Sequence, residues 1–296
     1  MHSLYTGGQQ GTPVDLVVWN LRLPRVIAAV VVGATLAAAG TAYQGMFRNP
    51  LVSPDILGVS AGAGMGAVLG IFLALPMVGI QILAFAGGMV AVSLVYAVST
   101  RARTHDPVLV LVLAGVAVGT LLGAGISLIK VFADPYSQLP SITFWLLGGL
   151  NAVSVNELYW ALPFIFAGLI PLFLLRWRIN LLTLSDSEAQ SLGVNTAYLR
   201  LALIVCATLM TAACVSFTGI IGWVGLLIPH VARLLVGPGF ARLLPTSLLM
   251  GAIFLLLTDN VARNASHMEL PLSVLTALVG APFFLYLLLR GNRHGR

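Results

Sequence analysis

The chain has 296 residues, of which 59% are hydrophobic and 8% are charged, and its mean hydropathy is +1.00. Soluble domains carry about a quarter charged residues, so this composition excludes an ordinary soluble enzyme, a disordered tail and a nucleic-acid-binding domain. The formal charge of +6 reports orientation rather than an anionic partner, because the basic residues of a polytopic membrane protein collect on one side of the bilayer.

Apolar runs of bilayer length fill most of the chain. A spanning helix needs about 20 mostly apolar residues, because its backbone must satisfy its own hydrogen bonds in lipid. Such runs predict about nine spanning helices, at 24–46, 56–75, 78–100, 108–131, 156–175, 199–217, 220–236, 243–261 and 270–289. The apolar piece at 141–150 is too short to span and is typical of a re-entrant or surface helix. The sequence therefore predicts an all-α, polytopic transmembrane bundle that forms one domain over residues 1–296.

The basic residues between these runs indicate which side each loop faces. If the loop with Arg101 and Arg103 is cytoplasmic, alternation puts 11 basic residues in the cytoplasm and four outside. The four outside are Arg22, Arg25, Lys130 and Arg263. This bias follows the positive-inside rule, so we expect an inner-membrane protein with a cytoplasmic C-terminus.

The sequence offers no energy source of its own. A nucleotide-binding P-loop needs a lysine after a glycine-rich loop, and Lys130, the only lysine, follows no such loop. Ion-coupled carriers place carboxylates within the bilayer; here the acidic residues map to loops or helix ends, and Asp259 is the nearest to an intramembrane position, where Arg263 can pair with it. The five histidines are scattered, so we expect no metal site, no cofactor and no catalytic residues. We expect another chain to supply the energy; a secondary transporter or channel that works without ATPases is the alternative.

The loop at 182–198 has the pattern of a short, capped helix. Ser185 and Glu188 form a capping-box pattern, and Asp186 favours the positive end of the helix. Gly193 can end the helix in the left-handed conformation, and Asn195 or Thr196 can cap the next span. Such a helix is either a solvated connector or a contact surface for another protein.

Small residues dominate the first two predicted spans, including Gly33, Gly40 and Gly62. In lipid, small residues allow helix backbones to approach closely. Close packing is the favoured explanation for them, and lining of a transport pathway is the alternative.

Four stretches together resemble the FecCD-type permease subunits of ABC importers for iron–siderophore complexes, haem and vitamin B12. The resemblance runs from about Trp19 to Leu289. The stretches are Leu21-Arg-Leu-Pro-Arg25, Gln44–Leu51 with Leu57–Ala63, Gly222–His230, and Glu269-Leu-Pro with Gly280–Phe283. The resemblance implies transport by alternating access, a second permease copy in a homodimer, two cytoplasmic ATPase subunits and a periplasmic substrate-binding protein, and no nucleic acid. The sequence does not name the cargo, and family abundance favours an iron–siderophore complex.

The resemblance also assigns roles to residues at both predicted faces. It implies that the ATPase engages a coupling helix, here Ser185, Asp186, Glu188, Ala189, Leu192 and Gly193. It implies that external arginines bind glutamates of the substrate-binding protein, and Arg22, Arg25 and Arg263 occupy the matching positions. Anchoring of these arginines at the membrane interface is the alternative.

The start of the chain departs from the family pattern. Members of the family have ten helices, and the first of them precedes the Leu-Arg-Leu-Pro-Arg segment. Charge alternation also places Met1 outside, without a leader sequence to carry it across. We therefore expect the native protein to carry an additional apolar span upstream of Met1.

Overall fold

The computed structural model describes residues 17–291, with gaps at 103–106, 152 and 266–268. Every regular element in these residues is a helix. Six helices are long and apolar enough to cross a membrane, and three further apolar helices are shorter. The prediction of an all-α, polytopic bundle is therefore confirmed, whereas the number of membrane crossings remains a prediction.

The helices lie where the apolar runs predict them. The long helices are α3 (Leu23–Phe47), α5 (Met77–Arg101), α6 (Pro107–Phe132), α8 (Val155–Ile179), α10 (Thr196–Thr218) and α12 (Phe240–Asn264). The other α-helices are α4 (Val59–Phe72), α7 (Gln138–Leu147), α9 (Asp186–Ser191), α11 (Val224–Val236) and α13 (Leu272–Gly291). Short turns of other helix types are η1 (Val18–Arg22), η2 (Pro54–Leu57) and η3 (Asn180–Thr183).

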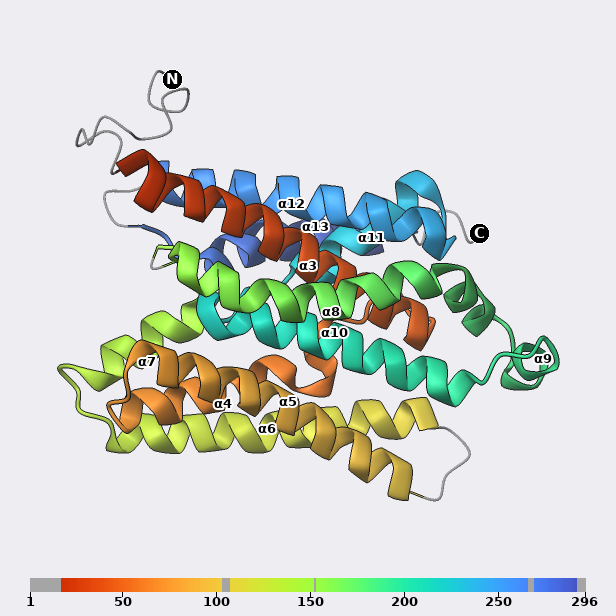
Figure 1. The fold of residues 1–296 in the computed structure, drawn as a ribbon, viewed down its shortest axis with the longest axis horizontal. Helices are drawn as coiled ribbons and strands as arrows, with labels where there is room; N and C mark the ends of the chain where they lie inside the picture. Colours follow the sequence, from red (N-terminus) through yellow and green to blue (C-terminus); the bar gives the residue numbers. More distant parts are fainter. Residues whose placement is uncertain (1–16, 103–106, 152, 266–268, 292–296) are drawn as a thin grey trace.

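The long helices run side by side along the long axis of the molecule, with α7 at one end and α9 at the other (Figure 1). We call these the α7 end and the α9 end. Helices α3 and α10 form the centre of the bundle. In the most apolar 18 residues of each helix, 72% of α3 and 78% of α10 are buried. Helix α3 packs on α10, α11 and α12, and α10 also packs on α8. Helix α7 is a short helix at one end, in agreement with its predicted inability to span.

Glycines bring the central backbones into direct contact. A Cβ added to Gly33 would lie 2.2 Å from the Gly251 oxygen, and one added to Gly40 would lie 1.8 Å from the Gly225 oxygen. Gly62 meets Gly87 of α5 in the same way, at 2.3 Å. No side chain fits at these distances, so close packing is the explanation that holds at these three glycines.

Two of the predicted spans are half-length helices. The prediction at 56–75 resolves into η2 followed by α4, and the prediction at 220–236 becomes α11, which begins at Val224. With 14 and 13 residues, these helices are about 20 Å long. The start of α11 lies at mid-depth of the bundle, because a Cβ on Gly225 would meet Pro54 at 2.7 Å and the oxygen of Leu36, halfway along α3, at 2.9 Å.

The position of η2 corrects one sequence interpretation. Asp55 is not near the end of the bundle: η2 lies well along its depth, where the Ile56 carbonyl approaches Gly115, the ninth residue of α6. The Asp55 side chain is accessible on the surface of this chain and accepts a hydrogen bond from the Ser60 hydroxyl. The chain segment before η2 turns back into the bundle, and hydropathy does not detect this turn because protein surrounds its backbone.

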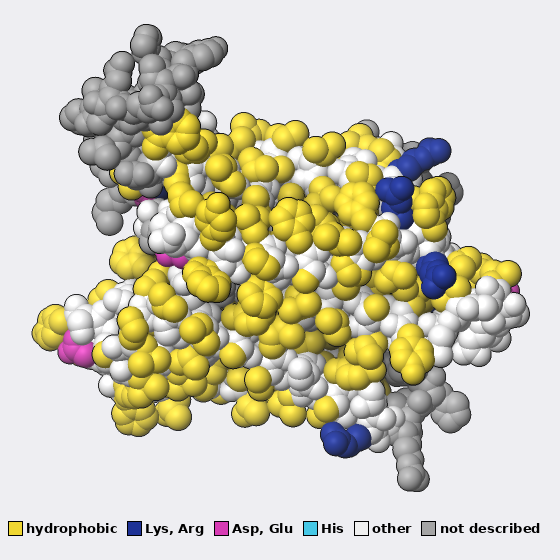
Figure 2. Space-filling model, in the orientation of Figure 1, with side chains coloured by type: hydrophobic (Ala, Val, Ile, Leu, Met, Phe, Trp, Pro, Cys, Tyr) yellow, Lys and Arg dark blue, Asp and Glu magenta, His cyan; other side chains and the backbone are white. Residues whose placement is uncertain are grey.

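Basic and acidic side chains lie toward opposite ends of the bundle surface. Figure 2 shows hydrophobic side chains over the length of the helices on this face. The visible Lys and Arg side chains gather toward the α9 end, while most of the visible Asp and Glu side chains lie toward the α7 end. A broad apolar belt between two polar ends is the surface that a bilayer requires.

Candidate docking surfaces at the two ends of the bundle

A cluster of four charged residues joins three elements at the α7 end. Arg25 lies in the first turn of α3, Asp259 and Arg263 lie one turn apart near the end of α12, and Glu269 precedes α13. We call this cluster the Arg25 network. Because α3 begins and α12 ends there, and the two helices pack on each other, residues more than 230 positions apart meet.

Arg25 divides its donors between two carboxylates. Its Nε donates to Asp259 Oδ1 at 2.9 Å and to Oδ2 at 3.2 Å, and its Nη2 lies 2.8 Å from Oδ1. Its Nη1 donates to Glu269 Oε1 at 2.9 Å and to Oε2 at 3.0 Å. Planar, two-point contacts of this kind are the strong form of arginine–carboxylate pairing.

Asp259 is the centre of the network. Its side chain has no exposed surface, and Arg263 Nε also forms an ion pair with it, at 3.2 Å from Oδ2. The pairing of Asp259 with Arg263 four residues later, expected from the sequence, is therefore confirmed. A buried carboxylate persists only when it is paired, and here two arginines share it.

The three arginines to which the resemblance gives the same docking role differ in their exposure to solvent. Arg22 is exposed, the Arg263 side chain is 27% exposed, and the Arg25 side chain is 11% exposed. Their contact with a binding protein remains a prediction. The role of Glu269 was missed, because nothing in the sequence relates it to Arg25, 244 positions away.

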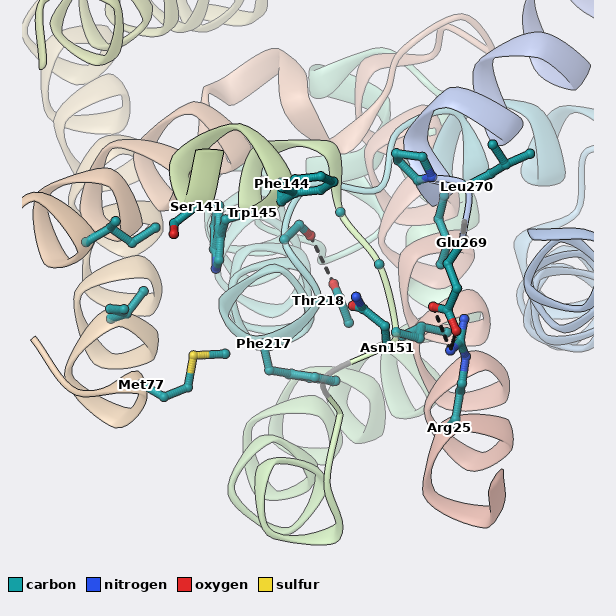
Figure 3. A pocket seen from close by; sticks show the side chains of 18 residues that line it. Arg25, Met77, Ser141, Phe144, Trp145, Asn151, Phe217, Thr218, Glu269 and Leu270 are labelled. Carbon is teal, nitrogen blue, oxygen red and sulfur yellow. Dashed lines mark hydrogen bonds and ion pairs between the residues drawn. The ribbon is translucent and has the colours of Figure 1, made fainter. Parts of the chain in front are cut away.

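A cavity opens beside the Arg25 network. It has a volume of about 330 Å³, and Figure 3 shows Arg25 and Glu269 on one side of it, with Trp145 and Met77 on the other. Asn151 and Thr218 lie between these two sides. The cavity is thus mainly apolar, with an ion pair at one edge.

The loop at the α9 end has the local structure that the sequence predicts. The Ser185 hydroxyl accepts a hydrogen bond from the Glu188 N–H, and the Ser185 N–H donates to Glu188 Oε2 at 2.9 Å. Hydrogen bonds from the Ser185 hydroxyl and N–H hold the pKa of Glu188 below its ordinary value. Asn195 caps α10, and Gly193 has a φ of +79°. The capping box, the αL glycine and the next cap are therefore confirmed.

Helix α9 offers exposed side chains while one face stays attached. Ala189 is fully buried, whereas Ser185, Glu188 and Leu192 are exposed, Leu192 by 60%. The side chain of Asp186 lies outside the described residues.

Two long-range contacts hold the chain just before α9. The Arg48 guanidinium donates to the carbonyl oxygens of Leu182 and Leu184. The Asn180 side chain accepts a hydrogen bond of 2.8 Å from the N–H of Phe240, where α12 begins. The base of α9 is thus attached to α12 and to the segment that leads into η2. Arg48 was not identified from the sequence as a contact residue.

Comparison with known proteins decides the family. The model of the FecCD transport family matches residues 2–290. The chain belongs to this family. It is therefore a membrane-spanning permease component of an ABC transporter, with partner permease and ATPase subunits.

Relatives with named transport functions align over nearly the whole chain. A probable iron chelatin transport system permease protein of Helicobacter pylori is 46% identical over 94% of this chain and 83% of its own length. The cobalamin import system permease protein BtuC of Halobacterium salinarum is 43% identical over 95% of this chain and 76% of its own. A solved structure described as an inward-facing metal-chelate type ABC transporter is 40% identical, with a TM-score of 0.89 over 94% of this chain and 89% of that one.

Proposed function

We propose that this permease carries an iron chelate across the inner membrane. The observation that carries this choice of cargo is the 46% identity with an iron chelatin permease over 94% of the chain. In this proposal two copies of the chain form a homodimer, a periplasmic binding protein delivers the chelate, and two ATPase subunits drive alternating access. ATP hydrolysis takes place on those subunits and not in this chain.

The charge distribution supports an orientation for the bundle. We assign the α9 end and the C-terminus to the cytoplasm, because the predicted cytoplasmic loops hold 11 of the 15 basic residues. The α7 end then faces the periplasm. This assignment places α9 on the ATPase side and the Arg25 network on the side of the binding protein.

We assign ATPase docking to α9 and its flanks, which are Ser185, Asp186, Glu188, Ala189, Leu192 and Gly193. The exposed side chains of α9 and the contacts that hold its base support this role. A docking helix must be held firmly in order to transmit a push into the bundle.

We assign docking of the binding protein to Arg22, Arg25 and Arg263. Exposed arginines attract carboxylates, and charges at the rim of an interface mainly raise the association rate. Arg22 and Arg263 have exposed surface for this purpose.

Uptake by the reconstituted transporter tests the cargo. The permease is purified with the ATPase and binding protein that co-purify with it and is placed in proteoliposomes. We expect ATP-dependent uptake of a radioactive ferric siderophore and no uptake when the P-loop lysine of the ATPase is replaced. Uptake of cobalamin but not of the ferric siderophore would contradict the iron assignment. Uptake without ATP would contradict the ATP-driven mechanism.

Association kinetics test the docking arginines. We expect the variant with Arg22, Arg25 and Arg263 all replaced by alanine to associate more slowly with the co-purified binding protein, by about tenfold or more at low salt. Its association rate should also depend less on salt than that of the wild type. Surface plasmon resonance measures both, and Lys130→Ala is the matched control at the same end. Because the triple variant leaves buried Asp259 without its two arginines, thermal melting of the purified variant verifies that it is folded. A triple variant that associates like the wild type refutes the assignment.

A further inference from the structure

The two carboxylates that bind Arg25 differ in their access to water. Asp259, which takes Nε and Nη2, has no exposed surface, whereas the side chain of Glu269, which takes Nη1, is 47% exposed. One side of the guanidinium is therefore bound to a buried carboxylate, and the other to a carboxylate in contact with solvent.

This difference decides which contact can be exchanged. Removing Asp259 from Arg25 would leave buried charges without partners, which is costly. Removing Glu269 costs less, because the freed carboxylate is half-exposed and can be hydrated, while Arg25 keeps Asp259 as its counter-charge. Only Nη1 can therefore change its partner while the rest of the network stays in place.

We propose that Glu269 is an internal substitute for a carboxylate of the binding protein. It occupies Nη1 of Arg25 in the free permease and leaves when an acidic side chain of the docking protein takes that position. This inference rests on the proposed docking role of Arg25. It makes Glu269 a competitor of the partner, so that binding at Arg25 is weaker than the guanidinium alone allows.

The surroundings of Nη1 fit such an exchange. The cavity of about 330 Å³ borders both Arg25 and Glu269, and Figure 3 shows their ion pair at one edge of it. An entering carboxylate therefore has space beside Nη1, and Glu269 has space to turn away. Arg263, which is 27% exposed, adds positive charge that favours an acidic group.

Two variants of Glu269 test the exchange. Glu269→Gln removes the charge of the competitor, and Glu269→Asp keeps the charge but shortens the side chain, so that it no longer reaches Nη1 in the same two-point contact. We expect the co-purified binding protein to dissociate from both variants about two- to fivefold more slowly than from the wild type. The effect should persist at high salt, because it changes a direct contact rather than long-range attraction.

The control is Asp134→Asn at the same end. Asp134 is an exposed carboxylate whose partner is Ser137, so its loss changes the charge of this end without changing the Arg25 network. We expect its dissociation rate to match the wild type. Thermal melting of each purified variant verifies that it is folded.

The outcomes separate the inference from the proposed function. Faster dissociation from both Glu269 variants would show that Glu269 positions Arg25 for the partner, and unchanged dissociation would show that the two carboxylates do not compete; either overturns the exchange. If Glu269→Gln dissociates more slowly and Glu269→Asp does not, the loss of negative charge and not the loss of a competing contact explains the change. This outcome also overturns the exchange. If the triple arginine variant associates like the wild type, the docking assignment itself fails, whatever the Glu269 variants do.

Discussion

Asp259 lies without any exposed surface between Arg25 of α3 and Arg263 of its own helix. Neither arginine would be stable in this position without a counter-charge, and Glu269 reaches only Arg25 among the described contacts. One carboxylate thus fixes two arginines of the α7 end and joins α3 to α12. Its contribution is larger than that of an exposed pair, because all three groups are withdrawn from water to some extent.

Replacing Asp259 by asparagine should therefore destabilise the protein. The substitution keeps the shape of the side chain and removes the charge, which leaves Arg25 largely buried with only Glu269 to balance it. Loss of one partner of a buried pair costs about 3–5 kcal/mol, which we expect to appear as a clear drop in the melting temperature of the detergent-solubilised permease. Asn260→Ala, at the exposed neighbouring position, is the control and should melt close to the wild type. Equal melting of Asp259→Asn and the control would contradict this role.

At the scale of elements, α9 is a helix of six residues that owes its start to one capping box. Because an isolated helix of this length is not stable in water, α9 depends on the cap, on buried Ala189 and on the contacts of Arg48 at its base. A charge reversal in the cap should therefore affect both the local structure and the surface offered to an ATPase.

Glu188→Lys is expected to weaken ATPase docking. A lysine cannot accept the Ser185 hydrogen bonds, and it opposes the helix dipole. The amount of ATPase that co-purifies with the permease and the substrate-stimulated hydrolysis should both fall. Glu188→Gln, which can still form the cap, separates the cap from the charge. In the wild type the pKa of Glu188 is lowered, so the ionised cap is present at neutral pH and is lost as pH falls through that lowered value. Unchanged co-purification in Glu188→Lys would refute the coupling role of α9.

How well the sequence predicted a contact depends on how far apart in the chain the two residues lie. The caps at Ser185 and Asn195 were predicted correctly because they join residues at most three positions apart. The spans were located because hydropathy is averaged over a whole helix. The turn into η2 was missed because hydropathy shows that residues 48–55 form a polar connection but carries no information on how deep in the bundle that connection lies. The pairing of Arg25 with Glu269 was missed because it depends on the packing of α3 and α12, which no local pattern encodes.

At the scale of the whole molecule, the bundle has two ends that differ in charge, and its two cysteines are both buried among the helices. Cys206 is 5% exposed and Cys214 is fully buried. By contrast, Tyr136, near α7, is 92% exposed, and Leu192, after α9, is 60% exposed. The proposed orientation places these two positions on opposite sides of the membrane.

Cysteine labelling should reveal that orientation without removal of the native cysteines. We expect a membrane-impermeant maleimide to leave the wild type nearly unlabelled in intact vesicles. Tyr136→Cys should react in right-side-out vesicles, and Leu192→Cys should react in inside-out vesicles. Labelling of both reporters from the same side would contradict the orientation, and the reverse pattern would invert it.

The contact of Gly40 with the Gly225 carbonyl limits how this protein can evolve. In most cores a larger residue on one element can be accommodated by a smaller residue on its neighbour. Here both positions already hold the smallest residue, and the group that a new methyl would strike is backbone, so no second substitution can restore the space. The same holds for Gly33 against Gly251. Lineages of this permease can therefore vary more freely at exposed positions such as Val90, which is 65% exposed, while α3 keeps its glycines for as long as it keeps its neighbours.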